Sequence, residues 1–145
     1  MCPLTLLQSV ARIGSSLIFL LGVACCSIGE ETSIAEAAVM EFHGRLNAGQ
    51  MDLIYESATE EFKKSSSKED ILRFLDGIRS KLGAANESRK LHWQVGHKQS
   101  GNIVTLTYAT RFSSGDVTEH FVYRFEDTSA KLLGYRIDSV KAITD

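Results

Sequence analysis

The sequence predicts an α+β domain in which N-terminal helices cover one face of an antiparallel sheet. From residue 33 to residue 83 the apolar residues recur every three or four positions, which is typical of amphipathic helices. After Gly83 they alternate with polar residues, which is typical of strands. The segments that link these strands are short, at 100–102, 113–116 and 127–129, and short links join antiparallel neighbours. Three helices packed on a curved four-stranded antiparallel sheet satisfy this order of elements.

The first helix is expected from about Ser33 to Ala48. Ser33 and Glu36 fit a capping box, in which each side chain satisfies a free backbone amide, and Gly49 fits the C-terminal stop. Its apolar stripe consists of Ala35, Val39, Phe42 and Leu46.

Two further helices are expected before Gly83. One covers residues 51–64, and Thr59 is a break point that would divide it into two pieces. The last one carries a stripe of apolar residues at helical spacing and ends at Gly83. Its start has two alternative capping pairs: Ser66 with Glu69, or Ser67 with Asp70.

Four strands follow, each with one apolar face. The residues that alternation places on the inner faces are Leu91, Trp93 and Val95; Val104, Leu106, Tyr108 and Phe112; Phe121, Tyr123 and Phe125; and Leu133, Tyr135 and Ile137.

The N-terminal region is typical of an export signal. No charged residue occurs from Ile13 to Gly29, positive charge precedes this stretch at Arg12, and small residues follow its apolar run at 17–24. The run is short for a membrane-spanning helix, which needs roughly 20 residues. The sequence therefore predicts a signal peptide or lipobox region at 1–26, a tether at 27–33, and a single α+β domain at 34–145.

Three fates of this segment are open. Residues 22–24 before Cys25 resemble a bacterial lipobox, in which the cysteine becomes lipid-modified, and Cys26 is the alternative acceptor. Ordinary cleavage after Ala24 also fits, as does an uncleaved anchor. Each fate predicts an exported protein, located in the cell envelope through a lipid anchor, in the periplasm, or outside the cell.

Composition excludes several classes of function. The 145 residues carry a net charge of −2 without a basic patch, which argues against a nucleic-acid partner. All three cysteines lie within the first 26 residues, so the domain lacks disulfides, thiolate zinc ligands and a cysteine nucleophile. His92 and His120 share the outer face of the sheet without a third ligand. We expect no metal and no cofactor.

Glu119 is the candidate catalytic residue, although no complete catalytic motif is present. By alternation its side chain shares the inner face with Phe121, where burial would raise its pKa and suit it to act as a general base. A candidate ligand pocket is formed by Trp93, Tyr108, Tyr123 and Tyr135. In the alternative interpretation Glu119 lies at the strand's open end near Asp116 and reaches solvent, and the tyrosines are core residues.

The chain also resembles a known family. The stretches that carry the likeness are "FHGRLNAGQMDLIYESATEEFKKSSSKEDILRFLDGIRSKLG" and "SRKLHWQV", which together run from Phe42 to Val95. They resemble small bacterial exported domains of unknown function with a nuclear-transport-factor-2-like fold, a cystatin-like α+β cone. The resemblance implies helices packed into a strongly curved sheet. It does not choose a function, because this fold holds isomerases, dehydratases, transport factors and interaction modules.

Three functional hypotheses follow. The first is a non-enzymatic envelope module that binds a small apolar ligand or an envelope protein. The second is a small-pocket enzyme of the isomerase or dehydratase type, with Glu119 as general base. The third is a structural domain that forms a homodimer through the outer face of its sheet, for which an exposed apolar patch on that face is expected.

Overall fold

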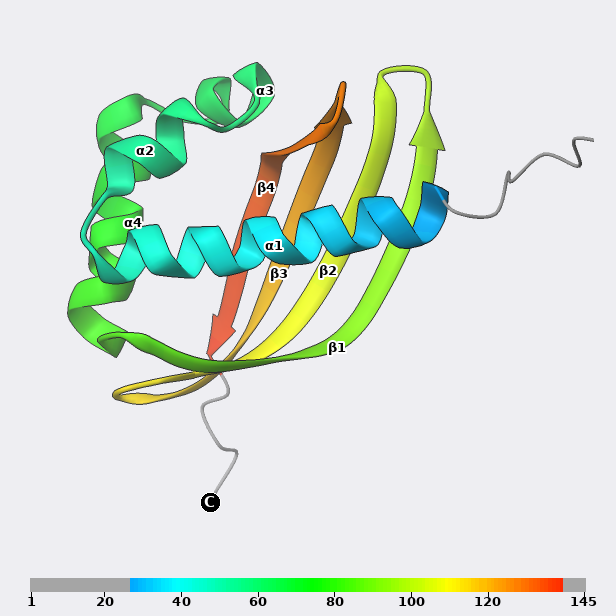
Figure 1. Cartoon of the computed structure of the whole chain (residues 1–145). Helices are drawn as coiled ribbons and strands as arrows, with labels where there is room; N and C mark the ends of the chain where they lie inside the picture. The colour runs from blue at the N-terminus through cyan, green and yellow to red at the C-terminus, as the bar shows by residue number, and fades with distance from the viewer. Residues whose placement is uncertain (1–26, 140–145) are drawn as a thin grey trace, which may run out of the picture.

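The structure, a computed structural model, describes residues 27–139 (Figure 1). The expected signal segment and both candidate lipidation residues, Cys25 and Cys26, lie outside the described residues. The described elements are α1 (Ser27–Asn47), α2 (Met51–Glu56), α3 (Glu60–Lys64), α4 (Lys68–Leu82), β1 (Ala85–Lys98), β2 (Gly101–Phe112), β3 (Gly115–Glu126) and β4 (Ser129–Ser139). None of the helices in this part of the chain is long and apolar enough to cross a membrane.

The α+β class and the four-stranded antiparallel sheet are confirmed. The strands pair in the order β1-β2-β3-β4, so each hairpin joins sequence neighbours. Helix α1 contacts all four strands and runs across one face of the sheet, while α2 and α4 pack against α1 (Figure 1). The helices therefore cover the sheet from one side, as the order of the sequence patterns requires.

Helix α1 begins at Ser27, six residues before the expected start at Ser33. The segment 27–33, expected as a tether, is thus helical, and Ser33 with Glu36 does not cap the helix. Two contacts explain the extension. Thr32 is buried, and a Glu31 carboxylate oxygen accepts a hydrogen bond of 2.6 Å from the side-chain amide of Asn102 at the start of β2. These contacts stabilise the helical residues before Ser33, which the capping pattern alone would not include in the helix.

The break at Thr59 is confirmed. Its hydroxyl accepts a hydrogen bond of 3.2 Å from the backbone amide of Phe62 and so caps α3, while its own amide donates to the carbonyl of Leu132 in β4. The four helices result from this division. At α4 the second capping alternative is correct, because the Ser67 hydroxyl accepts from the Asp70 amide at 3.1 Å.

Two β-bulges change the expected faces of β1 and β4. In β1 the register shifts between Lys90 and His92, which makes Leu91 the unpaired extra residue and leaves it 48% exposed. In β4 a second register shift makes Leu133 the unpaired extra residue. Leu132 is the buried residue in its place. The expected inward placement of Leu91 and Leu133 is therefore wrong. An unbroken period of two cannot anticipate an inserted residue.

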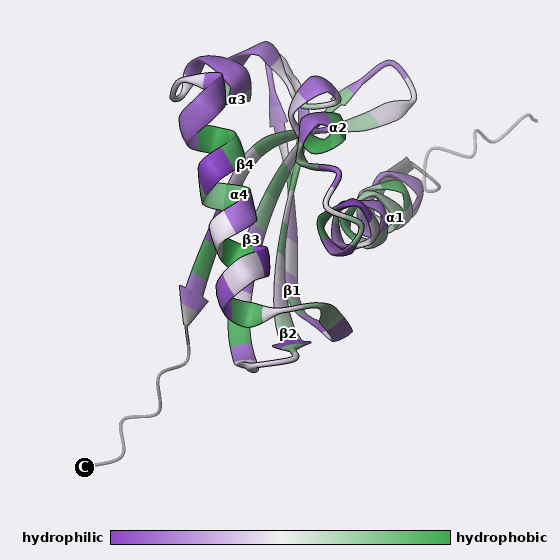
Figure 2. Cartoon of the chain, turned by 90° about the vertical axis from the view of Figure 1, so that its left-hand side faces the viewer, coloured by the Kyte–Doolittle hydropathy of each residue, from purple (hydrophilic) through white to green (hydrophobic). Residues whose placement is uncertain are grey.

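The core forms around Phe121, whose side chain is fully buried on β3. Bands of hydrophobic residues run along the strands and on α4 (Figure 2). Aromatic rings surround Phe121 at centroid distances of 5.0 to 6.1 Å, and they belong to Phe42, His43, Tyr108, Tyr123 and Tyr135. Edge contacts between such rings add to the stabilisation from burial. One of the rings that form the core is therefore a histidine, His43.

Two glycines, one inside α4 and one directly after it, give a matched test of this fold. Gly83 ends the helix at φ +79°, and an added Cβ would lie 2.8 Å from the Cβ of Ser113. Gly77 lies inside the helix with open space around it. We expect Gly83→Ala to lower the free energy of unfolding by more than about 1 kcal/mol, because alanine is strained at positive φ. Gly77→Ala should raise it by about 0.5–1 kcal/mol, measured by urea unfolding. Equal effects would contradict the described helix end.

Candidate functional site

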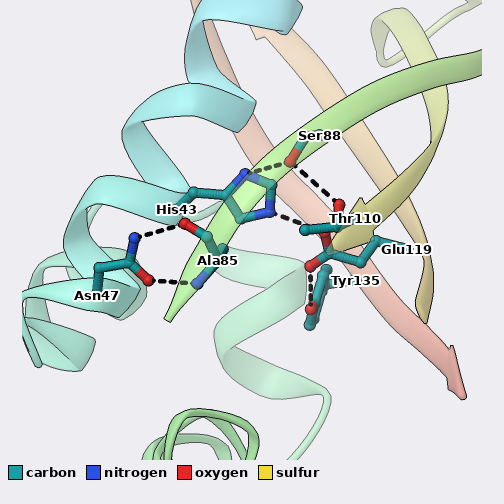
Figure 3. A network of polar contacts seen from close by, with 7 residues as sticks. All are labelled: His43, Asn47, Ala85, Ser88, Thr110, Glu119 and Tyr135. Atoms are coloured by element: carbon teal, nitrogen blue, oxygen red, sulfur yellow. Dashed lines mark hydrogen bonds and ion pairs between the residues drawn. The ribbon is translucent and has the colours of Figure 1, made fainter. Parts of the chain in front are cut away.

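Glu119 is buried on the inner face of the sheet. It lies on β3 opposite Tyr108 of β2 and Ile137 of β4, and its side chain has no exposed surface. Its carboxylate oxygens are 2.8 Å from Nε2 of His43 and 2.6 Å from the hydroxyl of Tyr135 (Figure 3). The structure thus selects the inward alternative for Glu119 and excludes the solvent-exposed one.

His43 continues this network toward the surface. It lies on α1, is 8% exposed, and directs its second ring nitrogen, Nδ1, toward the hydroxyl of Ser88 on β1 at 3.3 Å. The Ser88 hydroxyl is also 3.2 Å from that of Thr110 on β2. A chain of polar contacts therefore runs from the buried Glu119 through His43 to the exposed Ser88 (Figure 3).

The charge of Glu119 determines the direction of these hydrogen bonds. Burial by itself raises the pKa of this carboxyl. The hydrogen bond and electrostatic attraction of His43, with hydrogen bonds from Thr110 and Tyr135, outweigh burial and hold the pKa below its usual value. The raised pKa expected from the sequence is therefore wrong. An ionised carboxylate only accepts, so Nε2 of His43 carries the proton that it donates to Glu119. In the neutral ring Nδ1 is then an acceptor, and Ser88 donates to it.

The network also fixes the ionisation of the nearby tyrosines. Burial raises the pKa of Tyr135, and the negative charge of Glu119 raises it further. Burial likewise raises the pKa of Tyr123, and it raises that of Tyr108 to about 12. All three phenols are neutral near pH 7, and Tyr135 is a hydrogen-bond donor to Glu119.

The four aromatic residues expected to form one pocket do not line a common cavity. Tyr108 lines a groove between α1 and β1, whereas Tyr123 lines a cavity of about 270 Å³ beside α2 and β4. Tyr135 packs against Phe42 and Phe121 in the core. Trp93 lies opposite Leu106 on the inner face, yet it is 45% exposed on the edge strand. The structure thus gathers the three tyrosines around Phe121 as core residues and leaves Trp93 at the edge of the sheet.

The groove between α1 and β1 has a volume of about 500 Å³. At one end of the groove Asn47, the last residue of α1, joins the helix to the first residue of β1. Its side-chain amide exchanges hydrogen bonds of 2.8 and 3.0 Å with the backbone of Ala85 (Figure 3). Its lining residues are Glu36, Val39, Met40, His43, Gly44, Asn47, Ala85, Asn86, Ser88, Lys90 and Tyr108. Glu119 lines neither of these two cavities, so it can act on a bound molecule only through His43.

The β1 bulge brings a cation into the groove. Alternation with an inward Leu91 would place Lys90 on the outer face, but Lys90 pairs with Tyr108 and faces inward, because the register shifts just after it. There it forms an ion pair with Glu36 of α1. The groove therefore combines a lysine, a histidine and a hydroxyl with apolar side chains from α1.

His43 and Ser88 are the site residues that sequence reasoning missed. His43 follows Val39 by four positions, so helix geometry places it beside the apolar stripe. That spacing could have identified it as a buried histidine facing the sheet. Ser88 precedes the β1 bulge, and nothing in the sequence pattern marks its face.

No protein-family model matches the chain, and none of the curated proteins matches it. Within residues 27–139, no group of three or more histidine, cysteine, aspartate or glutamate side chains is arranged to hold a metal ion.

Glu119→Gln tests the buried charge. Because the pKa of Glu119 in the folded protein lies below its ordinary value of 4.5, its stabilisation is present above that pH and is lost as pH falls through the folded pKa. We expect the variant to lower the free energy of unfolding by about 1–3 kcal/mol near pH 7. The difference from the wild type should shrink as the pH falls below 4.5, measured by urea unfolding at several pH values.

The matched control is Glu69→Gln on the exposed surface of α4, which should change stability by less than about 0.5 kcal/mol. A Glu119→Gln effect that is equally small, or that grows toward low pH, would contradict an ionised and paired Glu119.

Proposed function

We propose that this domain binds a small molecule in the groove between α1 and β1. The observation that carries the proposal is the groove itself, whose volume of about 500 Å³ lies in the range of small-molecule sites. Sites of this kind combine apolar walls with a few polar groups that orient the ligand. Here Val39, Met40 and Tyr108 supply apolar surface, and Ser88 and Lys90 supply donors.

The lining favours an amphipathic ligand over the purely apolar one first expected. Lys90 is the one lysine or arginine among the described residues that line the groove, and its partner is the partly exposed Glu36. An anionic group on the ligand would compete with Glu36 for this ammonium. The apolar body would then cover Met40, which is 76% exposed. A short-chain carboxylic acid has this combination of properties.

The fold and location form part of the same proposal. The one-sided helical cover and the bulged antiparallel sheet support a nuclear-transport-factor-2-like cone. The charge and apolar order of residues 1–26 supports export, with Cys25 or Cys26 as lipid acceptor, so the ligand or an envelope protein would be met outside the cytoplasm. Intact mass of the chain made in a bacterium tests this. Acylation that Cys25→Ala or Cys26→Ala removes supports anchoring, and an uncut chain contradicts a cleaved signal.

A second candidate is the isomerase or dehydratase class. The observation that favours it is the pairing of His43 with Glu119, which places an oriented histidine at the groove. In this version His43 rather than Glu119 is the general base, because His43 lines the groove and Glu119 does not. Such chemistry would require no hydroxyl at Ser88.

The described outer face of the sheet does not support dimerisation. His120 lies there between Thr107 and Asp138, at 3.2 and 3.0 Å, and Asp138 also pairs with Arg136. This is a polar surface, whereas the homodimer hypothesis requires an apolar patch.

Gly44→Leu tests the binding proposal. Gly44 is a helical residue that lines the groove, and a Cβ there would meet nothing within 4 Å, so leucine should fill the groove without strain. We expect octanoate to shift the backbone amide resonances of Gly44, Ala85 and Ser88 in the full chain, measured by titration with ¹⁵N-labelled protein. Gly44→Leu should abolish these shifts.

Gly77→Leu is the matched control, since Gly77 is also helical with open space around it but lies on α4 away from the groove. It should bind octanoate as the wild type does. Shifts that map elsewhere, or that persist in Gly44→Leu, would contradict the groove as the site.

A further inference from the structure

The polar chain at the groove has the order of a nucleophile, a base and an orienting acid. Ser88 is exposed on β1, His43 is nearly buried on α1, and Glu119 is fully buried on β3. The joining distances are 3.3 Å from the Ser88 hydroxyl to Nδ1 and 2.8 Å from Nε2 to the Glu119 carboxylate. A hydroxyl within reach of a base that a third group orients is the geometric signature of an activated nucleophile.

The protonation states fit this order. Because Glu119 is ionised and only accepts, it holds the histidine proton on Nε2 and leaves the lone pair of Nδ1 directed at Ser88. The roles of the two ring nitrogens are exchanged relative to the usual serine–histidine–acid set, but the set is recognised by its geometry and roles. Tyr135 gives Glu119 a second donor at 2.6 Å, which keeps the carboxylate in place when the ring changes charge.

The surroundings supply the other requirements of acyl transfer. Lys90 lies two residues beyond Ser88 on the same strand face, roughly 7 Å along the strand, and lines the same groove. Its ammonium, which pairs with Glu36 in the free protein, would leave that partner to stabilise the oxyanion that forms when a carbonyl is attacked. Val39, Met40 and Tyr108 provide apolar surface for the acyl chain.

We propose that Ser88 is the nucleophile of an acyl-transfer site, with His43 as its general base, Glu119 as its positioning residue, and small esters of short-chain carboxylic acids as substrates. The Ser88 oxygen attacks the ester carbonyl carbon while its proton passes to Nδ1 of His43. The bond to the alcohol oxygen then breaks, and the alcohol leaves with that proton. Water, deprotonated by His43, then attacks the acyl-serine carbonyl. The bond to the Ser88 oxygen breaks, His43 returns the proton to that oxygen, and the acid is released. The inference rests on the proposed groove, which must admit the ester.

The test uses the full chain with two probes, a fluorophosphonate for covalent labelling and p-nitrophenyl butyrate for turnover. We expect one adduct per chain, mapped to Ser88 by peptide mass, and hydrolysis of the ester. Ser88→Ala should remove the adduct and lower hydrolysis roughly 100-fold or more. It should still fold, because Ser88 is exposed. Ser114→Ala, in the exposed turn between β2 and β3, should behave as the wild type does.

The positioning role of Glu119 has its own readout. Titration with the fluorophosphonate counts the competent sites, so a rate per titrated site is independent of how much protein folds. We expect Glu119→Gln to lower kcat per titrated site roughly tenfold or more with KM nearly unchanged. An unchanged kcat per site would overturn this role.

The remaining outcomes separate this inference from the groove. Octanoate shifts at the groove with no adduct on Ser88 would overturn the acyl-transfer site and leave ligand binding intact. An adduct on another residue, or hydrolysis that Ser88→Ala does not reduce, would also overturn it. Loss of both octanoate binding and labelling would remove the proposed function together with this inference.

Discussion

The hydrogen bond between His43 and Glu119 is the constraint on which the rest of the structure depends. A carboxylate removed from water costs several kcal/mol unless charges and donors compensate it. Glu119 has no exposed surface, so α1 must cross the sheet where His43 meets β3, and β4 must present Tyr135 from the other side. The aromatic rings around Phe121 then pack in the space that this crossing defines.

The same crossing produces the groove. Because His43 ties α1 to the centre of the sheet, the outer part of edge strand β1 lies partly uncovered, and Asn47 ties its beginning to the end of the helix. The space between α1 and β1 is open to solvent. His43 lines it, and the buried Glu119 holds the proton of this histidine on Nε2. A buried hydrogen-bond network thus reaches the surface at one hydroxyl, that of Ser88.

Local patterns could predict much of the fold. The period of three to four residues and the break at Thr59 act within one turn of a helix, so the sequence alone indicates them. The cap of α4 is narrowed to two alternative pairs by the same local pattern, and the structure decides for Ser67. The inward face of Glu119 follows from alternation. The bulges at Leu91 and Leu133 depend on pairing between strands, which no single segment specifies. The site residues His43 and Ser88 lie 45 positions apart, and their contact depends on one of those bulges.

The tautomer of His43 tests this account most directly. Long-range ¹H–¹⁵N correlation spectra of the full chain, recorded at mildly alkaline pH, distinguish a protonated from an unprotonated ring nitrogen. The account predicts a proton on Nε2 and an unprotonated Nδ1 that faces Ser88. Glu119→Gln should weaken this preference, because the negative charge of Glu119 is what holds the proton on Nε2 of His43. A neutral ring with its proton on Nδ1 would contradict both the ionised state of Glu119 and the role of His43 as a base toward Ser88.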